Sequence, residues 1–482
     1  MTNSVQFVDH LSIRLKGSYM RNLAWCVTAL WTFVFQLVLR TKLVYGEQFL
    51  ELRSIQTPGC KVYLAESMPE FLTFPTGSPK HISSYDAWRM ILNDATYGLN
   101  IASVYWTLLS NQTFTATNEG RGYYRVLKRR CSEIRVTIAQ NGSKHANEEL
   151  DGLADAGAKI YWIDVTKLAG RGILHTKLHT SDGRNAYIGS ANMDWRSLTE
   201  IRELGALMWG CYELVTDVDK IHATYVLVAD GIPKRWPREL ETEYNQNNPM
   251  RLEINGIPSR AFFSSSPPHL NPPGRANDLN VILSIINKAQ KFIHIEVMDY
   301  LTEIFPTANL PAMFWPDIDD ALRRAAIDRK VEVCLLVGNW PHTANEQYAY
   351  VKSLQALNGV RGAKLSVRWF TVPVYNAEQG SIPYARVNHA KFMVTETTAY
   401  IGTSNWSGNY FLYTGGIGFV VEQDEDGSKQ RNTSIREQLE ATFQRDWNSK
   451  YSSGYASGAR LFREISWISK LILLTLAIRV YL

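Results

Sequence analysis

Two stretches of this 482-residue chain decide its fold: His175-Thr-Lys177-Leu-His-Thr-Ser-Asp182 and His389-Ala-Lys391-Phe-Met-Val-Thr-Glu396. Each is followed by a glycine, a hydroxyl residue and an asparagine, in Gly189-Ser190-Ala-Asn192 and in Gly402-Thr403-Ser-Asn405. A single His-x-Lys on a strand is usually incidental. Two copies with the same continuation make coincidence very unlikely, and they predict an internal duplication.

Upstream of each histidine motif, three further pairs of segments match in the same order: 91–101 with 285–295, 134–142 with 331–339, and 157–165 with 362–370. In the first pair the apolar spacing changes from helical to alternating, and the other pairs read as strands. Each copy therefore predicts an α/β sandwich that ends in the histidine motif. We expect a first half at 40–245, a linker with many turn residues at 246–276, and a second half at 277–451.

The matching motifs are expected to meet in one pocket at the interface between the two halves. A histidine and a lysine two positions apart on a strand point to the same face. A turn and a return strand then bring back Ser190, Asn192, Thr403 and Asn405. Two imidazoles, two ammonium groups and two amides suit a tetrahedral anion whose charge grows in the transition state.

Two histidines allow a division of labour on a phosphodiester. One attacks phosphorus to form a phosphohistidine, and the other protonates the leaving oxygen and later takes a proton from water. We expect the lysines and asparagines to hold the nonbridging oxygens. Asp182 and Glu396 are expected to orient and charge-balance the imidazoles, or to pair with the lysines. No acidic cluster with metal-binding spacing accompanies the motif, so we expect no requirement for a metal or another cofactor.

At these residues the chain resembles the phospholipase D superfamily, and more narrowly its animal members three and four. The resemblance extends from about residue 60 to about residue 451, and four segments carry it most clearly: 189–200 (GSANMDWRSLTE), 314–326 (FWPDIDDALRRAA), 386–396 (RVNHAKFMVTE) and 399–411 (AYIGTSNWSGNYF). It implies two phospholipase D-type α/β/α sandwich halves that share one active site. It also implies that His175 is the nucleophile and His389 the general acid, with Lys177, Asn192, Lys391 and Asn405 on the phosphate. A disulfide between Cys60 and Cys211 is implied as well.

The resemblance implies a five-prime-to-three-prime exonuclease that acts on single-stranded DNA or RNA. The same branch also suggests phospholipase D or transphosphatidylase chemistry on lysosomal lipids, and the motif alone does not choose between these substrates. A catalytically silent, membrane-tethered binding protein is the alternative of another class, because the strand after Lys177 is more polar than the family's usual apolar run. Trp195 and Trp406 could stack on bases, but packing in the core is the commoner role of such residues. The net charge of +5 is too small to argue for nucleic acid by itself.

The ends of the chain point to a membrane. Residues 23–39 carry no charge and predict a transmembrane signal anchor, preceded by a cytosolic tail at 1–22. Residues 452–482 form a hydrophobic tail that is too short in apolar length to span a bilayer. Glycosylation is expected at Asn111, Asn141 and Asn432, each in an Asn-x-Ser/Thr sequon. The expectation is a single-pass type II protein of the endoplasmic reticulum, Golgi and endolysosome with its catalytic part in the lumen, and homodimer formation is left open.

Overall fold

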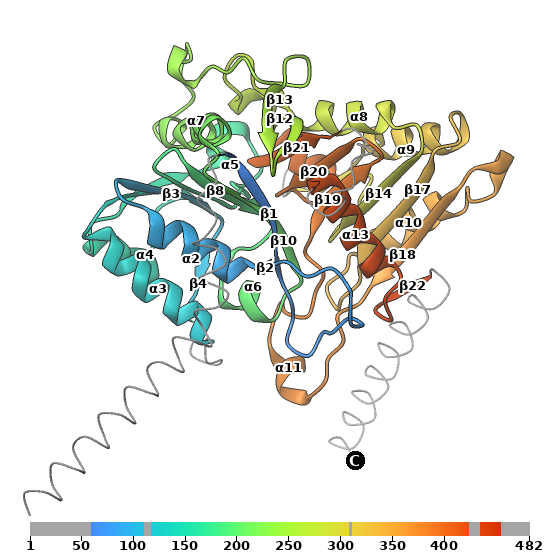
Figure 1. The fold of residues 1–482 in the computed structure, drawn as a ribbon, viewed down its shortest axis with the longest axis horizontal. Helices are drawn as coiled ribbons and strands as arrows, with labels where there is room; N and C mark the ends of the chain where they lie inside the picture. Colours follow the sequence, from blue (N-terminus) through green and yellow to red (C-terminus); the bar gives the residue numbers. More distant parts are fainter. Residues whose placement is uncertain (1–58, 110–116, 308–310, 424–433, 455–482) are drawn as a thin grey trace, which may run out of the picture. The chain divides into compact units, whose positions relative to one another are not determined.

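The computed structural model describes residues 59–109, 117–307, 311–423 and 434–454. The predicted anchor at 23–39, most of the hydrophobic tail, Asn111 and Asn432 lie outside these residues. Within the described part of the chain, no helix is both long and apolar enough to cross a membrane. The described residues belong to one compact unit that begins at Gly59, and two large sheets organise it (Figure 1).

The first sheet has eight strands in the order β2-β1-β10-β8-β7-β3-β5-β6. Their bounds are Ile82–Ser83, Lys61–Ser67, Glu203–Trp209, Asn185–Gly189, Leu178–Ser181, Gly98–Ser103, Arg135–Asn141 and Lys159–Ile163. Strands β3, β5 and β6 run parallel to one another, and β7 with β8 forms the antiparallel hairpin that follows the first histidine motif.

The second sheet repeats this order as β13-β12-β21-β20-β19-β14-β17-β18 and adds β11 and β22 at its ends. The bounds of the repeated strands are Ala276–Asn277, Ile257–Ser266, Gly416–Glu422, Thr398–Gly402, Lys391–Thr395, Phe292–Val297, Glu332–Gly338 and Leu365–Phe370, and those of the added strands are Met250–Ile254 and Ser452–Gly454. The predicted duplication and its α/β class are therefore confirmed strand by strand.

Helices cover the outer faces of both sheets (Figure 1). In the first half these are α2 (Ser84–Asp94), α3 (Asn118–Cys131) and α4 (Glu148–Asp155), and in the second half α8 (Asp278–Lys288), α9 (Asp317–Ile327) and α10 (Asn345–Gln355). Even the helix starts repeat: Ser83 caps α2 by accepting from the Asp86 N–H, and Asn277 caps α8 by accepting from the Asn280 N–H.

Shorter elements complete the chain. The remaining helices are α5 (Val165–Ala169), α6 (Trp195–Thr199), α7 (Tyr212–Val228), α11 (Ala377–Ser381), α12 (Gly408–Leu412) and α13 (Ile435–Trp447), with 3-10 turns at Arg238–Leu240, Pro268–Leu270 and Val360–Gly362. Two small ribbons pair β4 (Trp106–Thr107) with β9 (Met193–Asp194), and β15 (Glu303–Ile304) with β16 (Met313–Phe314).

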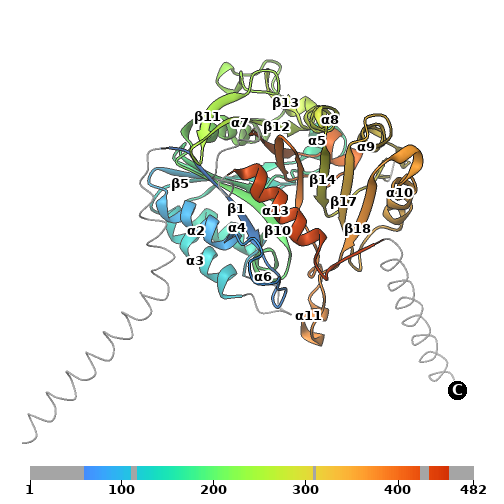
Figure 2. The same cartoon turned by 45° about the vertical axis from the view of Figure 1, so that its right-hand side comes forward.

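One apolar core lies between the two sheets and joins the halves. It contains side chains from β1, β8 and β10 of the first sheet and from β12, β19, β20 and β21 of the second. The helices that follow each copy are shared: α7 also contacts β12 of the second sheet, and α13 also contacts β1 of the first. Figure 2 shows α13 lying over β1 and β10. A second apolar cluster lies wholly within the second half, between its sheet and the helices α8, α9 and α10.

The predicted linker at 246–276 is wrong. It contains β11 and β12, and β12 pairs with β21 in the second sheet. By strand order β12 is the counterpart of β1, so the second copy begins near Ile257 rather than at 277. The turn residues around this segment are real, but they flank a ten-residue strand whose Ala261, Phe262 and Phe263 enter the core.

Candidate active site

The two histidine motifs, far apart in the sequence, meet where the sheets face each other. The His175 N–H donates to the Gly415 carbonyl at 2.8 Å, just before β21. The His389 N–H donates to the Arg202 carbonyl, also at 2.8 Å, just before β10. Each histidine is thus held by the backbone of the opposite half. Both side chains are buried, with 7% and 8% of the residue surface exposed.

The imidazoles differ in what holds their Nδ1 atoms. His389 Nδ1 lies 2.8 Å from a carboxylate oxygen of Glu203, the first residue of β10. His175 Nδ1 lies 2.9 Å from the backbone carbonyl oxygen of Thr403. By strand order the counterpart of Glu203 is Gly416, the first residue of β21, which carries no side chain. The site is therefore two-fold in its backbone and asymmetric in its charge.

This asymmetry separates the basicities of the two imidazoles. Burial lowers the pKa of His175 well below its usual value, and the charges of Lys177, Lys391 and His389 add to the shift. Burial also lowers the pKa of His389, to about 4, but there the Glu203 carboxylate opposes the shift. His175 is consequently the imidazole that stays unprotonated more readily, and His389 is the imidazole whose protonated form has a carboxylate partner.

The two lysines occupy equivalent positions. Lys177 Nζ donates to the carbonyl oxygen of His175 at 2.7 Å, and Lys391 Nζ donates to that of His389. An ammonium group has three N–H donors, so each keeps donors for a bound anion. Burial lowers the pKa of Lys177 well below its usual value and that of Lys391 to about 7. An anion in the pocket would reverse these shifts, as expected for a phosphate site.

The two asparagines lie beside the histidines in different environments. The Asn192 backbone N–H bonds Ser197 Oγ, whose hydroxyl donates to Glu203 at 2.8 Å. Asn405 Nδ2 donates to Asp299 at 2.7 Å and to the Tyr410 hydroxyl at 3.3 Å. The side-chain oxygens of both asparagines are buried without a hydrogen-bond partner among the described residues. Such atoms mark a pocket that is built for another molecule.

The hydroxyls predicted to bind phosphate are engaged elsewhere. Ser190 Oγ donates to the Leu204 carbonyl at 3.1 Å, and Thr403 Oγ1 accepts from the Ile417 N–H at 3.0 Å. Both residues have no exposed surface. The prediction of a phosphate contact is therefore wrong for these two hydroxyls, which bridge adjacent strands. Thr403 contributes through its backbone carbonyl instead.

The prediction that Asp182 and Glu396 orient the imidazoles or pair with the lysines is also wrong. Asp182 accepts from the N–H groups of three consecutive residues, 96–98, at the start of β3. Glu396 accepts in the same way from residues 290–292, at the start of β14. The reason is simple geometry: seven residues of extended chain span roughly 23 Å, which places each carboxylate at the far end of its strand from its histidine.

Three residues of the site were missed from sequence: Glu203 beside His389, Tyr410 beside His175, and Asp299 beside Asn405. Of these three, Glu203 was the easiest to predict from the sequence, because it is a single carboxylate at the start of an otherwise apolar strand, ELGALMW. Burial raises the pKa of Asp299 to about 6, against the nearby Lys391 charge. The Tyr410 ring lies edge-on to His175, with 4.9 Å between ring centroids. No sequence pattern pointed to Asp299 or Tyr410.

The polar strand after Lys177 is accommodated without disturbing the site. Asp219 of α7 accepts from Thr180 and, at 3.0 Å, from Asn100 on the neighbouring strand. His179 lies in an aromatic cluster, with its ring 4.8 Å from that of Trp88. Trp195 and Trp406 are buried. The two tryptophans thus pack in the interior, the role that the sequence favoured for them, and His179 does the same.

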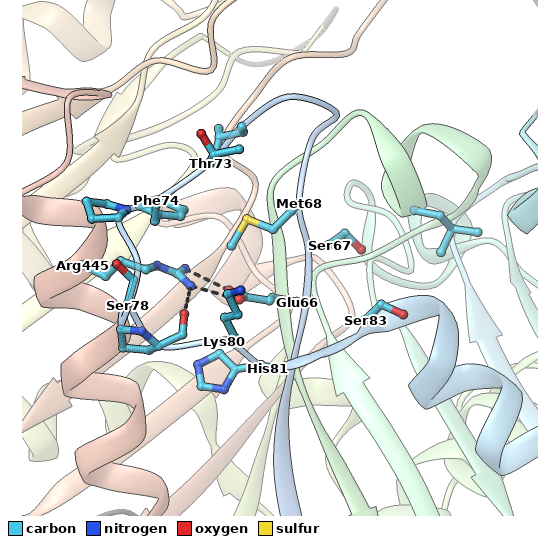
Figure 3. Close-up of a pocket in the computed structure, with 14 residues that line it drawn as sticks. Glu66, Ser67, Met68, Thr73, Phe74, Ser78, Lys80, His81, Ser83 and Arg445 are labelled. Carbon is cyan, nitrogen blue, oxygen red and sulfur yellow. Dashed lines mark hydrogen bonds and ion pairs between the residues drawn. The ribbon is translucent and has the colours of Figure 1, made fainter. Parts of the chain in front are cut away.

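A buried ion network anchors Arg202, whose carbonyl holds His389. The Arg202 guanidinium donates to Asp446 of α13 at 2.8 Å and lies 3.4 Å from Glu66 of β1. Arg445 pairs with Glu66 at 2.9 Å, as Figure 3 shows. Glu66 and Arg445 also line a separate cavity of about 450 Å³ that extends over residues 72–83. These ion pairs therefore link strand β1 and helix α13 to Arg202, the residue whose carbonyl binds His389.

The cysteines behave as the resemblance implied. Cys60 and Cys211 form a disulfide, whereas Cys131 and Cys334 are free and buried. Of the three predicted glycosylation sites, only Asn141 lies in the described residues. It ends β5, is partly exposed, and its side-chain oxygen accepts from the Leu174 N–H at 2.8 Å, next to His175.

Comparisons with known proteins agree with this geometry. Residues 76–375 match the family model described as "PLD3/4, PLD-like domain". The chain is 43% identical over 405 residues to the 5'-3' exonuclease PLD3 of Macaca fascicularis, covering 82% of this chain and 80% of the relative. It is 40% identical over 410 residues to the 5'-3' exonuclease PLD4 of Mus musculus, with the same coverage. The crystal structure of phosphatidylserine synthase from Haemophilus influenzae covers 81% of this chain and 92% of its own at a TM-score of 0.50; at 12% identity this likeness shows the fold alone.

The duplicated sheets and paired histidine motifs define a phospholipase D-type protein with both halves in one chain. Within that class, the chain belongs to the PLD3/4 family of PLD-like domains.

Proposed function

We propose that this protein is a phosphodiesterase that removes nucleotides from the five-prime end of single-stranded DNA or RNA through a phosphohistidine, without a divalent metal. The observation that carries the chemistry is the unequal pair of imidazoles, His389 with Glu203 as partner and His175 with a backbone carbonyl. The choice of nucleic acid is supported by the relatives named 5'-3' exonuclease at 40–43% identity.

The reaction follows from these groups. His175 Nε2 attacks phosphorus while His389 gives its proton to the departing oxygen, so that a P–N bond replaces a P–O bond. Lys177 and Lys391 stabilise the nonbridging oxygens as their charge grows. His389, now neutral, then takes a proton from water, which attacks phosphorus and displaces His175. The products are an alcohol and a phosphomonoester.

The test uses one single-stranded oligonucleotide labelled at either its five-prime or its three-prime end, and an equal amount of phosphatidylglycerol, in EDTA at acidic and neutral pH. We expect the five-prime label to appear at once as a mononucleotide, while the three-prime label shortens stepwise. Turnover of the lipid alone would favour the phospholipase alternative. No turnover of either would favour a silent binding protein, and activity restored by one divalent ion would contradict the metal-free mechanism.

We also propose that the catalytic part lies in the lumen of the endolysosomal route, behind a signal anchor at 23–39. The uncharged anchor segment, the sequons and the Cys60–Cys211 disulfide support this placement. Glycosidase treatment of protein from cells should increase its mobility. Unmodified Asn111, Asn141 and Asn432 in cells that glycosylate other cargo would contradict a lumenal location.

A further inference from the structure

A second cavity, of about 320 Å³, opens beside the His389 strand. It is lined by residues 339–342 after β17, by 371–374 after β18, and by 379–386 from α11 towards His389. Trp340 packs against Val387, two residues before His389, and against Ile201, next to the Arg202 that holds it. The cavity therefore lies on the side of the site that contains His389, the proposed proton donor.

Aromatic rings line this cavity. The His342 ring lies 4.8 Å from that of Tyr384 at an interplanar angle of 23°, and 4.7 Å from that of Trp340. Tyr384 is 60% exposed although it stands five residues before a catalytic histidine. Exposed rings next to a phosphodiester site offer a surface on which a planar ring can stack.

Two of the residues that line the cavity carry donors without acceptors. Trp340 Nε1 and Gln379 Nε2 are buried with no hydrogen-bond partner among the described residues. Both residues are more than nine-tenths buried, at 8% and 4% exposure. The orientation of the Gln379 amide is settled, because its oxygen accepts from the Tyr375 N–H at 3.1 Å. Buried donors left unpaired are costly, which points to an acceptor supplied by a ligand.

Formal charge contributes little to the lining. Among the residues that line the cavity, no acidic side chain occurs, and Arg386 is already committed to Glu200 and to the carbonyls of Glu70 and Pro373. What remains is a set of rings and two neutral N–H donors. A planar, neutral heterocycle with oxygen or nitrogen acceptors on its edge fits this set, and a nucleobase is such a molecule.

We propose that this cavity binds the base of the nucleotide whose oxygen His389 protonates. The proposal rests on the function proposed above and deepens it by assigning one base-binding subsite. The position of the cavity on the His389 side assigns it to the leaving group rather than to the nucleotide held on His175. Stacking on Tyr384 and His342 tolerates any base, while Trp340 and Gln379 satisfy the acceptors on its edge.

The test compares two oligonucleotides that lack one base, either in the first or in the second nucleotide, with the intact strand. One of the two, the one whose missing base belongs to the leaving nucleotide, should show a KM about 10- to 100-fold above that of the intact strand. Tyr384→Ala should raise the KM for the intact strand similarly and abolish the difference. Tyr384→Phe keeps the ring and should behave like wild type.

Two further variants keep the result independent of folding. Gln379→Glu preserves the acceptor for Tyr375 but replaces the donor with a carboxylate oxygen. Because the position is 4% exposed, the buried carboxylate should lower the melting temperature, and for the folded enzyme KM should rise while kcat stays unchanged. Tyr97→Ala removes a tyrosine that is 81% exposed, at the start of β3, and should alter nothing. Equal KM values for all three strands with Tyr384→Ala at wild-type level, or an effect of Tyr384→Ala confined to phosphatidylglycerol, would overturn the subsite and leave the nuclease standing. No cleavage of any oligonucleotide would overturn the proposed function and the subsite together.

Discussion

At the scale of the residue, the proposed chemistry depends on one carboxylate that contacts only one of the two histidines. Glu203 contacts His389 at 2.8 Å, while the equivalent position opposite His175 is Gly416. The carboxylate favours the imidazolium form of His389, and nothing comparable favours it for His175. This difference is the reason for proposing His175 as the nucleophile and His389 as the general acid.

Removing each histidine should have a different result. With a p-nitrophenyl phosphodiester, whose leaving group needs no proton, His389→Ala should release about one equivalent of nitrophenol in a burst and then slow sharply. His175 is still phosphorylated, but the base that activates water is missing. His175→Ala should show no burst. Rapid mixing followed by absorbance measures both, and a burst from the His175 variant would exchange the two roles.

Glu203→Gln should shift the pH dependence of the rate. The carboxylate raises the pKa of His389, so its removal lowers that pKa further and depopulates the acid form at any given pH. The decline of kcat/KM at increasing pH should therefore move towards acid by on the order of one pH unit, with about 10-fold less activity at neutral pH. A pH–rate profile measures it. An unshifted profile with uniformly lower activity would indicate a purely structural role.

At the scale of the element, the spacing from histidine to carboxylate that the two motifs share serves the stability of the fold. Asp182 and Glu396 each accept from three backbone N–H groups and fasten the turn of a hairpin to the start of the neighbouring antiparallel strand, β3 or β14. Burial would raise the pKa of Glu396, but the backbone donors outweigh it and lower that pKa. Its stabilising contribution is therefore present above the pKa of the unfolded chain and is lost as the pH falls through the lowered value.

Glu396→Gln should accordingly destabilise the fold by about 1–3 kcal/mol at neutral pH. The carboxylate is replaced by a neutral amide, which is a weaker acceptor for the three backbone N–H groups. The kcat of the folded variant should change little, since the carboxylate lies away from the histidines. Urea unfolding and turnover of the same preparation separate the two effects. Asp182→Asn is the matched variant in the other half, and a large loss of kcat at wild-type stability in either would restore a catalytic role.

The repeated elements, and the meeting of their histidine motifs between the halves, were predictable from the sequence, whereas the individual side-chain contacts across that interface were not. The strands at 134–142 and 331–339 are local patterns, and both histidines carry their lysine two positions away on the same strand. Glu203 and Tyr410 reach the histidine of the opposite half only because the two sheets meet there. Asp299 contacts Asn405 within its own half, after the end of β14, where no sequence pattern marked it. Asp182 was misplaced for the opposite reason, since nearness in a motif was taken for nearness in space. The strand β12 was missed because prolines and serines at its borders resemble a linker.

At the scale of the whole molecule, buried charge crosses from one half to the other. Glu66, Arg202, Arg445 and Asp446 form a closed network of ion pairs, and Glu296 of β14 lies beside it, accepting from Asn388 at 2.9 Å. Burial raises the pKa of Glu296 to about 8, and the charge of Asp446 acts in the same direction. The residue next to His389 is therefore bound by a carboxyl group that is protonated at neutral pH.

This raised pKa predicts a pH-dependent stability. Between about pH 4.5 and 8 the unfolded chain loses the Glu296 proton before the folded chain does, so the wild type loses stability as the pH rises. Glu296→Gln cannot titrate and retains an oxygen for Asn388. The melting temperature of the variant relative to wild type should rise between pH 5 and pH 8 and level off above. Glu253→Gln, at an exposed position on β11, is the control; a difference for Glu296→Gln that is flat with pH would refute the assignment.

The contact between the first described strand and the last described helix has a consequence for synthesis of the chain on the ribosome. Strand β1 is synthesised early, but the ion pair of Glu66 with Arg445 and the packing of α13 on β1 can form only after α13 has been synthesised. His175 likewise waits for Gly415, some 240 residues later. No nascent fragment that ends before α13 can therefore contain an assembled site. A chain truncated before α13 should therefore lack phosphodiesterase activity even though it contains both histidine motifs, because the contacts of α13 with β1 are missing.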